Sequence, residues 1–397
     1  MEKKTIILGV TGGIAAYKSA GIASYLIKRG HDVHVIMTKN ATEFIAPLTF
    51  ETLTNNRVSV GVFDRNFQYD VNHVEIAKKA DLFVVAPATA NAIAKFATGI
   101  ADDMLSTTFL ACRAPKLIAP AMNTAMLENP ITERNIEMLK ELGIYFIDAA
   151  SGLLACGDVG TGKLADIDDI HEMIDYLLEQ EKPLAGKTVV VTAGPTTEPL
   201  DPVRFITNHS SGKMGYELAR AARNLGANVH LISGPTNLRP PLGVDITQVS
   251  TAGAMFEIAM KLSQDYDIFI GAAAVSDFRP KKVFLNKLKK STHDLSSLKM
   301  QENPDIVASV AKTSSSDQIV CAFAMETENL IENARTKLIS KNVDIIVAND
   351  LSDQGAGFKS DDNRVTIITR DEQFQLDLMS KQSVAYKIMD KLINMVM

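Results

Sequence analysis

The sequence predicts an α/β protein built from two Rossmann-like, doubly wound domains in tandem. Two segments, residues 5–37 and 188–232, share one pattern of an apolar strand, a glycine-bearing turn, an amphipathic helix, and a glycine leading into a second apolar strand. A doubly wound sheet opens with a βαβ unit of this kind. The length of 397 residues also suits two or three domains, at roughly 150 residues each.

The N-terminal half contains five short apolar runs separated by stretches long enough for crossover helices. Continuously apolar strands of this kind are typical of parallel sheets that are covered on both faces. The expected strands are 5–10, 33–37, 82–86, 116–119 and 145–147, and the first helix extends to residue 28.

The C-terminal half repeats the plan, with a helix expected over 214–225. Its expected strands are 188–192, 229–232, 268–272, 319–323, 344–348 and 365–368. An amphipathic helix over 170–178 and a polar stretch over 179–187 separate the halves. We therefore place the boundary at Lys182-Pro183, with domains 1–182 and 183–397.

Composition excludes several classes of function. The 41 Lys and Arg against 47 Asp and Glu, a net charge of -6, lack the basic excess of a nucleic-acid partner. Three cysteines without paired spacing predict a reduced, cytoplasmic protein. Gly12-Gly13 interrupts the apolar N-terminus, and apolar runs fall short of the roughly 18–20 residues that span a bilayer, so no membrane association is expected.

The turn after the first strand indicates a mononucleotide site. It lacks the three-glycine dinucleotide pattern, and Thr38 follows the second strand where an NAD site needs Asp or Glu. Gly12 and Gly13 precede a helix, so the turn offers N–H donors to one phosphate, and the Thr38 hydroxyl can assist, which suits FMN. A glycine turn that only packs closely explains the pattern about equally well.

Three strings follow predicted strands, where doubly wound folds bind ligands: residues 86–91, 101–105 and 119–126. Together with residues 12–18 and His73 they resemble the flavin-dependent cysteine decarboxylases, a flavodoxin-like family that includes phosphopantothenoylcysteine decarboxylases. The resemblance implies FMN contacts at Gly12, Gly13, Ile14, Thr38, Ala88, Thr89, Ala90, Ala101 and Asp102.

The same resemblance gives three residues catalytic roles. His73 would be the base beside the flavin, although a lone histidine after Asn72 is more often a capped helix start. Asn123 would hold the substrate carboxylate. Cys156 lies in a stretch rich in glycine, 151–163, that predicts a mobile flap, and it would be the proton donor. Cys112 and Cys321, on apolar elements, are expected to be packing residues.

In the second half, Ser211-Gly212-Lys213 invites comparison with a Walker motif. The match fails, because Met214 replaces the magnesium-binding Ser or Thr and Thr207 replaces the first glycine. A Ser- and Gly-rich loop that opens a helix remains, and such a loop can hold a phosphate. With residues 192–215, 272–278 and 303–307, this string resembles the phosphopantothenate–cysteine ligases.

That resemblance implies a nucleotide site, in which Asp277 recognises the nucleotide or its Mg²⁺ and Asn208 orients the acyl intermediate. Lysines at 287–290 would otherwise be a solvated face. The implied CTP contacts are Ser210, Ser211, Gly212, Lys213, Met214, Gly271, Ala272, Ala273, Asp277, Lys287, Lys289, Pro304, Asp305, Ile306, Val307, Phe323, Lys337 and Lys341. Met325 stands where the family often has Ala.

The whole chain resembles the bacterial bifunctional family of coenzyme A biosynthesis, which implies a C–N ligase followed by a carboxy-lyase. The ligase would join cysteine to 4'-phosphopantothenate with CTP and Mg²⁺ through an acyl-cytidylate. The FMN-dependent half would convert phosphopantothenoylcysteine to 4'-phosphopantetheine by oxidative decarboxylation and re-reduction.

The family also implies a homo-oligomer, with a trimeric flavin half and a dimeric ligase half. Two other interpretations stay open. A non-catalytic regulatory scaffold that binds nucleotide or flavin would be expected to lose His73, Asn123 or Cys156, and all three are present. An NAD-linked flavin dehydrogenase would need the ribose-binding acid that is absent after the second strand.

Overall fold

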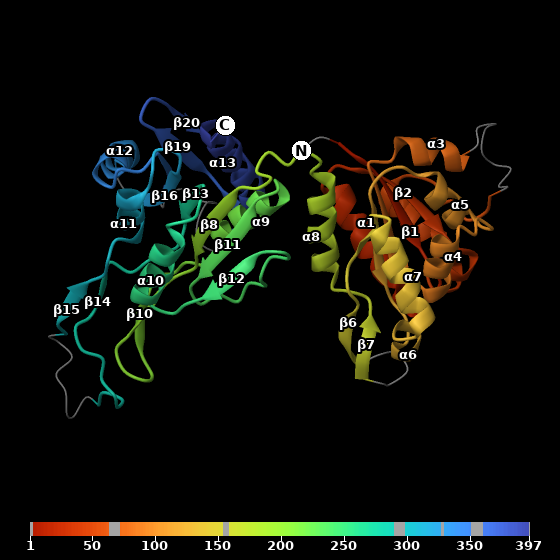
Figure 1. Ribbon diagram of the computed structural model, residues 1–397, viewed down its shortest axis with the longest axis horizontal. Coiled ribbons are helices and arrows are strands. Elements are labelled where there is room, and N and C mark those ends of the chain that lie inside the picture. The colour runs from red at the N-terminus through yellow and green to blue at the C-terminus, as the bar shows by residue number, and fades with distance from the viewer. Residues whose placement is uncertain are drawn as a thin grey trace. The chain divides into compact units, whose positions relative to one another are not determined.

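The computed structural model describes residues 3–62, 72–153, 159–289, 298–326, 329–350 and 360–396. The chain divides into two compact units, Met1–Gln180 (the N-terminal unit) and Glu181–Met397 (the C-terminal unit). Each unit has its own sheet covered by helices (Figure 1). Within the described ranges, no helix combines the length and the apolar character that a bilayer crossing requires.

The N-terminal unit is built on a parallel five-stranded sheet in the order β2-β1-β3-β4-β5. Its strands are β1 (Thr5–Val10), β2 (Asp32–Met37), β3 (Leu82–Ala88), β4 (Lys116–Pro120) and β5 (Tyr145–Phe146). This order is that of a flavodoxin-like doubly wound sheet, and it confirms the predicted fold class. Strand order reverses between β1 and β3, so the ligand-binding edge lies at the carboxyl ends of these two strands.

Helices cover both faces of this sheet, α1 and α8 on one and α4, α5 and α7 on the other (Figure 1). The helical segments are η1 (Ile14–Lys18), α1 (Ser19–Lys28), η2 (Lys39–Glu43), α2 (Pro47–Thr54), α3 (Asn72–Lys79), α4 (Ala90–Thr98), α5 (Met104–Ala111), α6 (Thr124–Leu127), α7 (Pro130–Glu141) and α8 (Ile167–Leu178). The hairpin β6 (Ala150–Leu153) and β7 (Val159–Lys163) stands apart from the main sheet.

The C-terminal unit contains an eight-stranded sheet in the order β12-β11-β8-β13-β16-β17-β19-β20. Its strands are β8 (Thr188–Ala193), β11 (Asn228–Ser233), β12 (Asp245–Gln248), β13 (Ile268–Gly271), β16 (Ile319–Glu326), β17 (Ile345–Asp350), β19 (Val365–Thr369) and β20 (Gln373–Gln375). The six strands from β12 to β17 are parallel, and β19 and β20 join antiparallel at one edge.

Two helices, α9 (Lys213–Asn224) and α13 (Lys381–Val396), cover one face of this sheet. The other face is covered by α10 (Ala252–Leu262), α11 (Ile306–Thr313) and α12 (Leu330–Ser340) (Figure 1). Three further strand pairs are β9 (Thr197–Pro199) with β10 (Phe205–Thr207), β14 (Phe278–Pro280) with β15 (Met300–Glu302), and β18 (Asp362–Asn363) with β21 (Met379–Ser380).

The apolar runs of the sequence form the two cores. Ile7 and Phe83 in the N-terminal unit and Val190 and Phe269 in the C-terminal unit are at most 1% exposed, because parallel strands with helices on both faces have no solvent side. Cys112 and Cys321 are both buried, and burial raises the pKa of each thiol. Their predicted packing role is confirmed.

Candidate active sites

The turn after β1 requires glycine at residue 12. A Cβ there would lie 2.5 Å from the Cβ of Asn40 and 2.8 Å from its carbonyl carbon, so the backbone of η2 closes tightly on the turn. The predicted helix after the turn begins as the 3₁₀ segment η1, with Gly13 at its N-cap in an extended conformation. Thr38 caps η2, its Oγ1 accepting from the N–H of Ala41 at 3.3 Å.

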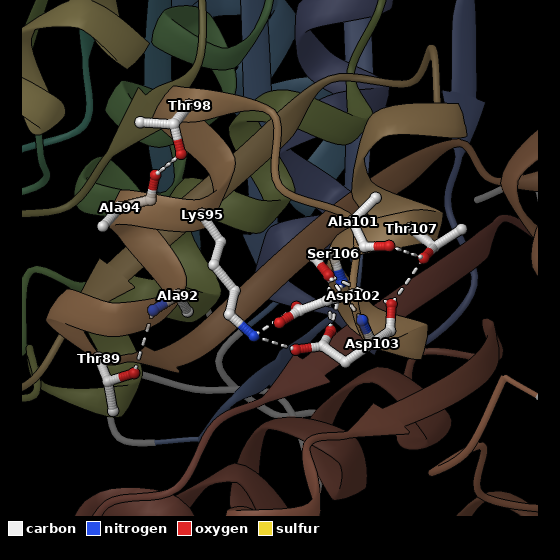
Figure 2. Close-up of polar contacts among 10 residues, drawn as sticks. All are labelled: Thr89, Ala92, Ala94, Lys95, Thr98, Ala101, Asp102, Asp103, Ser106 and Thr107. Carbon is white, nitrogen blue, oxygen red and sulfur yellow. Dashed lines mark hydrogen bonds and ion pairs between the residues drawn. The ribbon is translucent and has the colours of Figure 1, made fainter.

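Thr11 ties this turn to the end of β3. Its Oγ1 donates to the carbonyl of Pro87 at 2.8 Å and accepts from the N–H of Thr89 at 3.0 Å. Thr89 in turn caps α4, accepting from the N–H of Ala92 at 3.4 Å (Figure 2). The predicted flavin residues Gly12, Gly13, Thr89 and Ala90 therefore lie around one edge of the sheet, where N–H groups can bind a phosphate.

The predicted flavin residues Ala101 and Asp102 stand in a turn that Lys95 holds against α4. The Lys95 Nζ contacts Asp102 Oδ1 at 2.6 Å and Asp103 Oδ2 at 2.8 Å (Figure 2). Asp103 caps α5 in a reciprocal capping box with Ser106. Burial would raise the pKa of Asp103, but hydrogen bonds from Lys95 and Ser106 outweigh it and lower the pKa below its usual value.

Asn123 follows β4 and caps α6, its Oδ1 accepting from the N–H of Ala125 at 2.9 Å. The hairpin reaches this point, since the N–H of Met122 donates to the carbonyl of Gly162 at 2.9 Å. Only glycine fits at 162, because its φ is +146° and a Cβ would lie 2.2 Å from the carbonyl oxygen of Met122. The hairpin that carries the glycine-rich string thus contacts the Asn123 string.

Two predicted catalytic residues, His73 and Cys156, lie partly or wholly outside the described part of the chain. His73 is the second residue of α3, and its side chain is outside the described part of the chain. Cys156 lies in 154–158, between β6 and β7, outside the described residues. Their assignments stay predictions.

The C-terminal unit has a cavity of about 690 Å³ at the carboxyl edge of its sheet. It lies where strand order reverses between β8 and β13, the usual ligand position in such folds. Besides Asn208, the cavity is lined by sixteen of the predicted nucleotide residues: Ser210, Ser211, Gly212, Lys213, Met214, Gly271, Ala272, Ala273, Asp277, Pro304, Asp305, Ile306, Val307, Phe323, Lys337 and Lys341.

Lys287 and Lys289 do not line this cavity, and both are exposed. Leu288 between them is buried, and its N–H donates to Asp201 Oδ2 at 3.1 Å. Burial opposes ionisation of Asp201, but N–H donors including that of Leu288, together with Arg204, lower its pKa to about 2. The segment is thus anchored on Asp201, and the lysines on either side of Leu288 are exposed.

Two glycines in the cavity wall leave no room for a side chain, because neighbouring side chains lie close to their backbones. Gly212 has φ +78°, and a Cβ there would lie 2.7 Å from Thr236 Cγ2. At Gly271 a Cβ would lie 2.4 Å from Val307 Cγ2. Asn208 links two segments of the cavity wall. Its Nδ2 donates to the carbonyls of Ala274 at 3.1 Å and Val275 at 3.3 Å.

The cavity also has polar residues that the sequence did not single out. Ser276 is 6% exposed, and its Oγ makes no hydrogen bond within the described residues. Asn349, Asn363 and Lys381 come from the last strands and from the start of α13. Asn349 lies in β17 and Asn363 in β18, whereas Lys381 begins an ordinary amphipathic helix and has no local signal in the sequence.

Few side chains of the described residues could bind a metal ion in this cavity. In the described ranges, no set of three or more His, Cys, Asp or Glu side chains is grouped to hold a metal ion. Asp277 is one of two aspartates among the cavity-lining residues, with Asp305. A nucleotide-bound Mg²⁺ takes most ligands from phosphate and water, so the assignment of Asp277 remains a prediction.

Two family models match the chain. "Flavoprotein" matches residues 1–179, and "DNA/pantothenate metabolism flavoprotein C-terminal domain" matches residues 184–396.

Relatives match along nearly the full length. The Coenzyme A biosynthesis bifunctional protein CoaBC of Vibrio parahaemolyticus is 45% identical, covering 98% of both chains. Its namesake in Bacillus subtilis is 44% identical over 99% of this chain and 97% of that protein. That of Escherichia coli is 43% identical over 98% and 97%. The chain belongs to the CoaBC family of bifunctional coenzyme A biosynthesis proteins.

Proposed function

We propose that the chain catalyses two consecutive steps of coenzyme A biosynthesis. Residues 183–397 would ligate cysteine to 4'-phosphopantothenate with CTP, and residues 1–182 would decarboxylate the phosphopantothenoylcysteine formed to 4'-phosphopantetheine with FMN. One observation supports the ligase most strongly: a single cavity gathers Asn208, Asp277 and Lys341 from three separate segments.

The ligase must make a carboxylate into an electrophile. Transfer of CMP to the carboxylate releases pyrophosphate and leaves an acyl-cytidylate, from which the amine of cysteine displaces CMP. Lys213, Lys337 and Lys341 line the same cavity as the loop before α9. Ammonium and N–H groups placed there stabilise negative charge that develops on the phosphates.

Asn208 would orient the acyl intermediate. Its Nδ2 is held by the carbonyls of Ala274 and Val275, so its Oδ1 is the atom that can accept from a substrate N–H. A pantothenoyl group carries such an amide. Mg²⁺ would accompany CTP beside Asp277.

The N-terminal unit fits FMN, since Thr11 joins the tight turn at Gly12 to the start of α4, and a glycine turn beside a helix start can bind a phosphate through backbone N–H groups. FMN, when bound, supplies a reversible hydride acceptor beside the substrate. His73 would remove a proton from the substrate and Cys156 would return one. The Oδ1 of Asn123 caps α6, and its Nδ2 carries N–H donors of the kind that bind a carboxylate.

The remaining proposals concern the assembly. We propose a cytoplasmic homo-oligomer, trimeric through the flavin half and dimeric through the ligase half. A purely regulatory scaffold is not favoured, because relatives over the full length are named as bifunctional biosynthetic proteins.

The deciding experiment follows pyrophosphate release from CTP with 4'-phosphopantothenate, with and without cysteine. Pyrophosphate should appear in both cases, with continued turnover only when cysteine is present. The purified protein should also be yellow with noncovalent FMN. A colourless protein that takes up no FMN would refute the flavin assignment, and absence of CTP-dependent pyrophosphate would refute the ligase.

The catalytic roles in the flavin half are tested by two variants. Cys156→Ser should bleach its flavin on mixing with phosphopantothenoylcysteine and stall with an oxidised enethiol, because a serine hydroxyl is a far weaker acid than a thiol of pKa about 8.5. His73→Asn should show little bleaching. Stopped-flow absorbance and product mass distinguish the two, and normal turnover by Cys156→Ser would contradict its role.

A further inference from the structure

Lys381, the first residue of α13, is a buried lysine in the wall of the ligase cavity. The residue is 6% exposed and lines the cavity together with the loop that precedes α9. Its Nζ donates to the carbonyl of Ser360, and its backbone N–H donates to the carbonyl of Asp361 at 2.9 Å. The side chain and the backbone of Lys381 are thus both held in place.

A second ammonium lies nearby. Lys213, the first residue of α9, also lines the cavity, and its Nζ contacts Asp361 Oδ1 at 2.6 Å. The two helices pack on the same face of the sheet. Their first residues therefore bring two positive charges to one end of the cavity, where Asp361 forms an ion pair with Lys213 and its charge also acts on Lys381.

We infer that Lys381 is a further phosphate-binding residue of this cavity, acting with Lys213 and the 210–212 loop on the β- and γ-phosphates of the nucleotide and on released pyrophosphate. In the same step the phosphates displace Asp361 from Lys213. The inference rests on the proposed ligase function of the cavity, to which it adds a residue and an exchange of counter-ions.

The electrostatics favour a polyanion at this end. Burial lowers the pKa of Lys381, and the charge on Lys213 lowers it further, while Asp361 and Asp362 act in the opposite direction. A buried ammonium beside a second one is costly unless negative charge lies close to both. A phosphate group placed between Lys213 and Lys381 would take over this role from Asp361 and carry more negative charge.

The surroundings of Asp361 allow its carboxylate to separate from Lys213 when phosphate binds. It is not among the residues that line the cavity, and its side chain is 87% exposed, so water can solvate the carboxylate after displacement. One of the lysines on the opposite face of the sheet is paired differently. Lys341 contacts Asp305 at 2.9 Å, and Asp305 itself lines the cavity, so that end already holds its own anion.

The test removes the charge of Lys381 and keeps an N–H donor. Lys381→Gln replaces the ammonium with an uncharged amide of similar size, so it tests the charge with a small change of shape. Lys387→Gln, at an exposed position of the same helix, is the matched control. Dissociation constants of the full chain for CTP, inorganic pyrophosphate and cytidine are measured for both variants and for the unchanged protein.

We expect Lys381→Gln to bind CTP and pyrophosphate about 10- to 100-fold more weakly, the size of a lost charged hydrogen bond. Cytidine binding should not change, and Lys381→Arg should restore most of the affinity. A merely structural role would weaken all three ligands alike. Unchanged pyrophosphate affinity, or an equal loss for cytidine, overturns the inference.

Asp361→Asn provides an independent measurement at an exposed side chain. Because it removes the anion that competes with phosphate, pyrophosphate should bind a few-fold more tightly at low salt, with the gain lost at high salt. If Lys381→Gln does not fold, unchanged pyrophosphate affinity in Asp361→Asn overturns the inference. Absence of CTP-dependent pyrophosphate release from the unchanged protein would instead refute the ligase proposal. The two outcomes are distinguishable, because pyrophosphate can bind to the cavity whether or not the protein has ligase activity.

Discussion

The side-chain Nδ2 of Asn208 donates to the backbone carbonyl of Ala274 at 3.1 Å, across 66 residues of sequence. This bond joins the loop before α9 to the segment that follows β13. The two segments lie on either side of the point where strand order reverses, so the bond spans the position at which the ligase substrates are proposed to meet.

Asn208→Asp should slow the cysteine-dependent stage of the ligase and let acyl-cytidylate accumulate. The introduced carboxylate cannot donate to the carbonyls of Ala274 and Val275, and it would be repelled by both. Quenched-flow analysis with mass detection measures the intermediate. Asn228→Asp, at an exposed residue of β11, is the control, and equal turnover of the two variants would contradict the role of Asn208.

Gly12→Ala should weaken flavin binding and destabilise the N-terminal unit. The added Cβ would stand 2.5 Å from the Cβ of Asn40, and overpacking of this kind costs roughly 1–3 kcal/mol. Flavin retention on gel filtration and urea unfolding measure the two effects. Gly61→Ala is the matched control, since a Cβ there meets no atom of the described residues within 4 Å. If both variants retain flavin equally, the close turn is not needed for binding.

Lys95→Met should loosen the turn that holds Asp102 and reduce flavin affinity. It breaks contacts of 2.6 and 2.8 Å to two carboxylates, which we expect to cost about 1–2 kcal/mol at this partly exposed position. Isothermal titration with FMN measures the loss. Lys140→Met, which breaks the exposed pair with Glu137, should change nothing, and an equal effect would count against the proposal.

The Lys95 variant should also change acid stability. The lowered pKa of Asp103 stabilises the folded state above the unfolded pKa, and this stability is lost as pH falls through the folded value. Without Lys95 the folded pKa rises, so the N-terminal unit should lose less of its stability on acidification. Acid titrations of both proteins, followed by far-UV circular dichroism, test the sign.

His171 predicts a second pH dependence. Its ring stacks on that of Tyr25 with centroids 3.7 Å apart, and burial is the main cause that lowers its pKa from 6.5 to about 4. Between these values the unfolded chain binds a proton that the folded chain does not. The free energy of unfolding of the N-terminal unit should therefore decrease as pH is lowered through this range, by up to about 1.4 kcal/mol per pH unit.

Hydrogen exchange of α1 and α8 between pH 7 and 4, corrected for intrinsic rates, measures this slope. His171→Phe keeps the stacked ring and removes the titration, so the slope should flatten. His230→Gln, in the C-terminal unit, should leave it unchanged. A slope that persists in His171→Phe would assign the pH dependence to other groups.

The fold was largely readable from the sequence because its signals are local. Apolar runs at residues 5–10 and 188–192, each followed by a glycine turn and an amphipathic helix, specify βαβ units without long-range information. Strand ends were less well defined. The run predicted over 319–323 continues to Glu326 in β16, because pairing with β17 extends it beyond its apolar residues.

The two sites were only partly readable. Segments such as 86–91 and 207–215 can be identified as candidate sites because they have glycine, proline and asparagine at strand ends, where a doubly wound fold binds its ligands. Lys287 and Lys289 have a comparable pattern but do not line the cavity; both are exposed on a segment that Leu288 anchors to Asp201. Sequence alone does not specify that anchor.

The sequence by itself determined the two doubly wound domains and most of the loops that form their sites, because strand periodicity and turn residues act over a few positions. Only the tertiary structure decided which charges meet. Lys213 contacts Asp361 across 148 residues, and Lys381 joins them because α13 packs beside α9 on one face of the sheet. Burial and ion pairing depend on how helices pack on a sheet, and no local pattern encodes that packing.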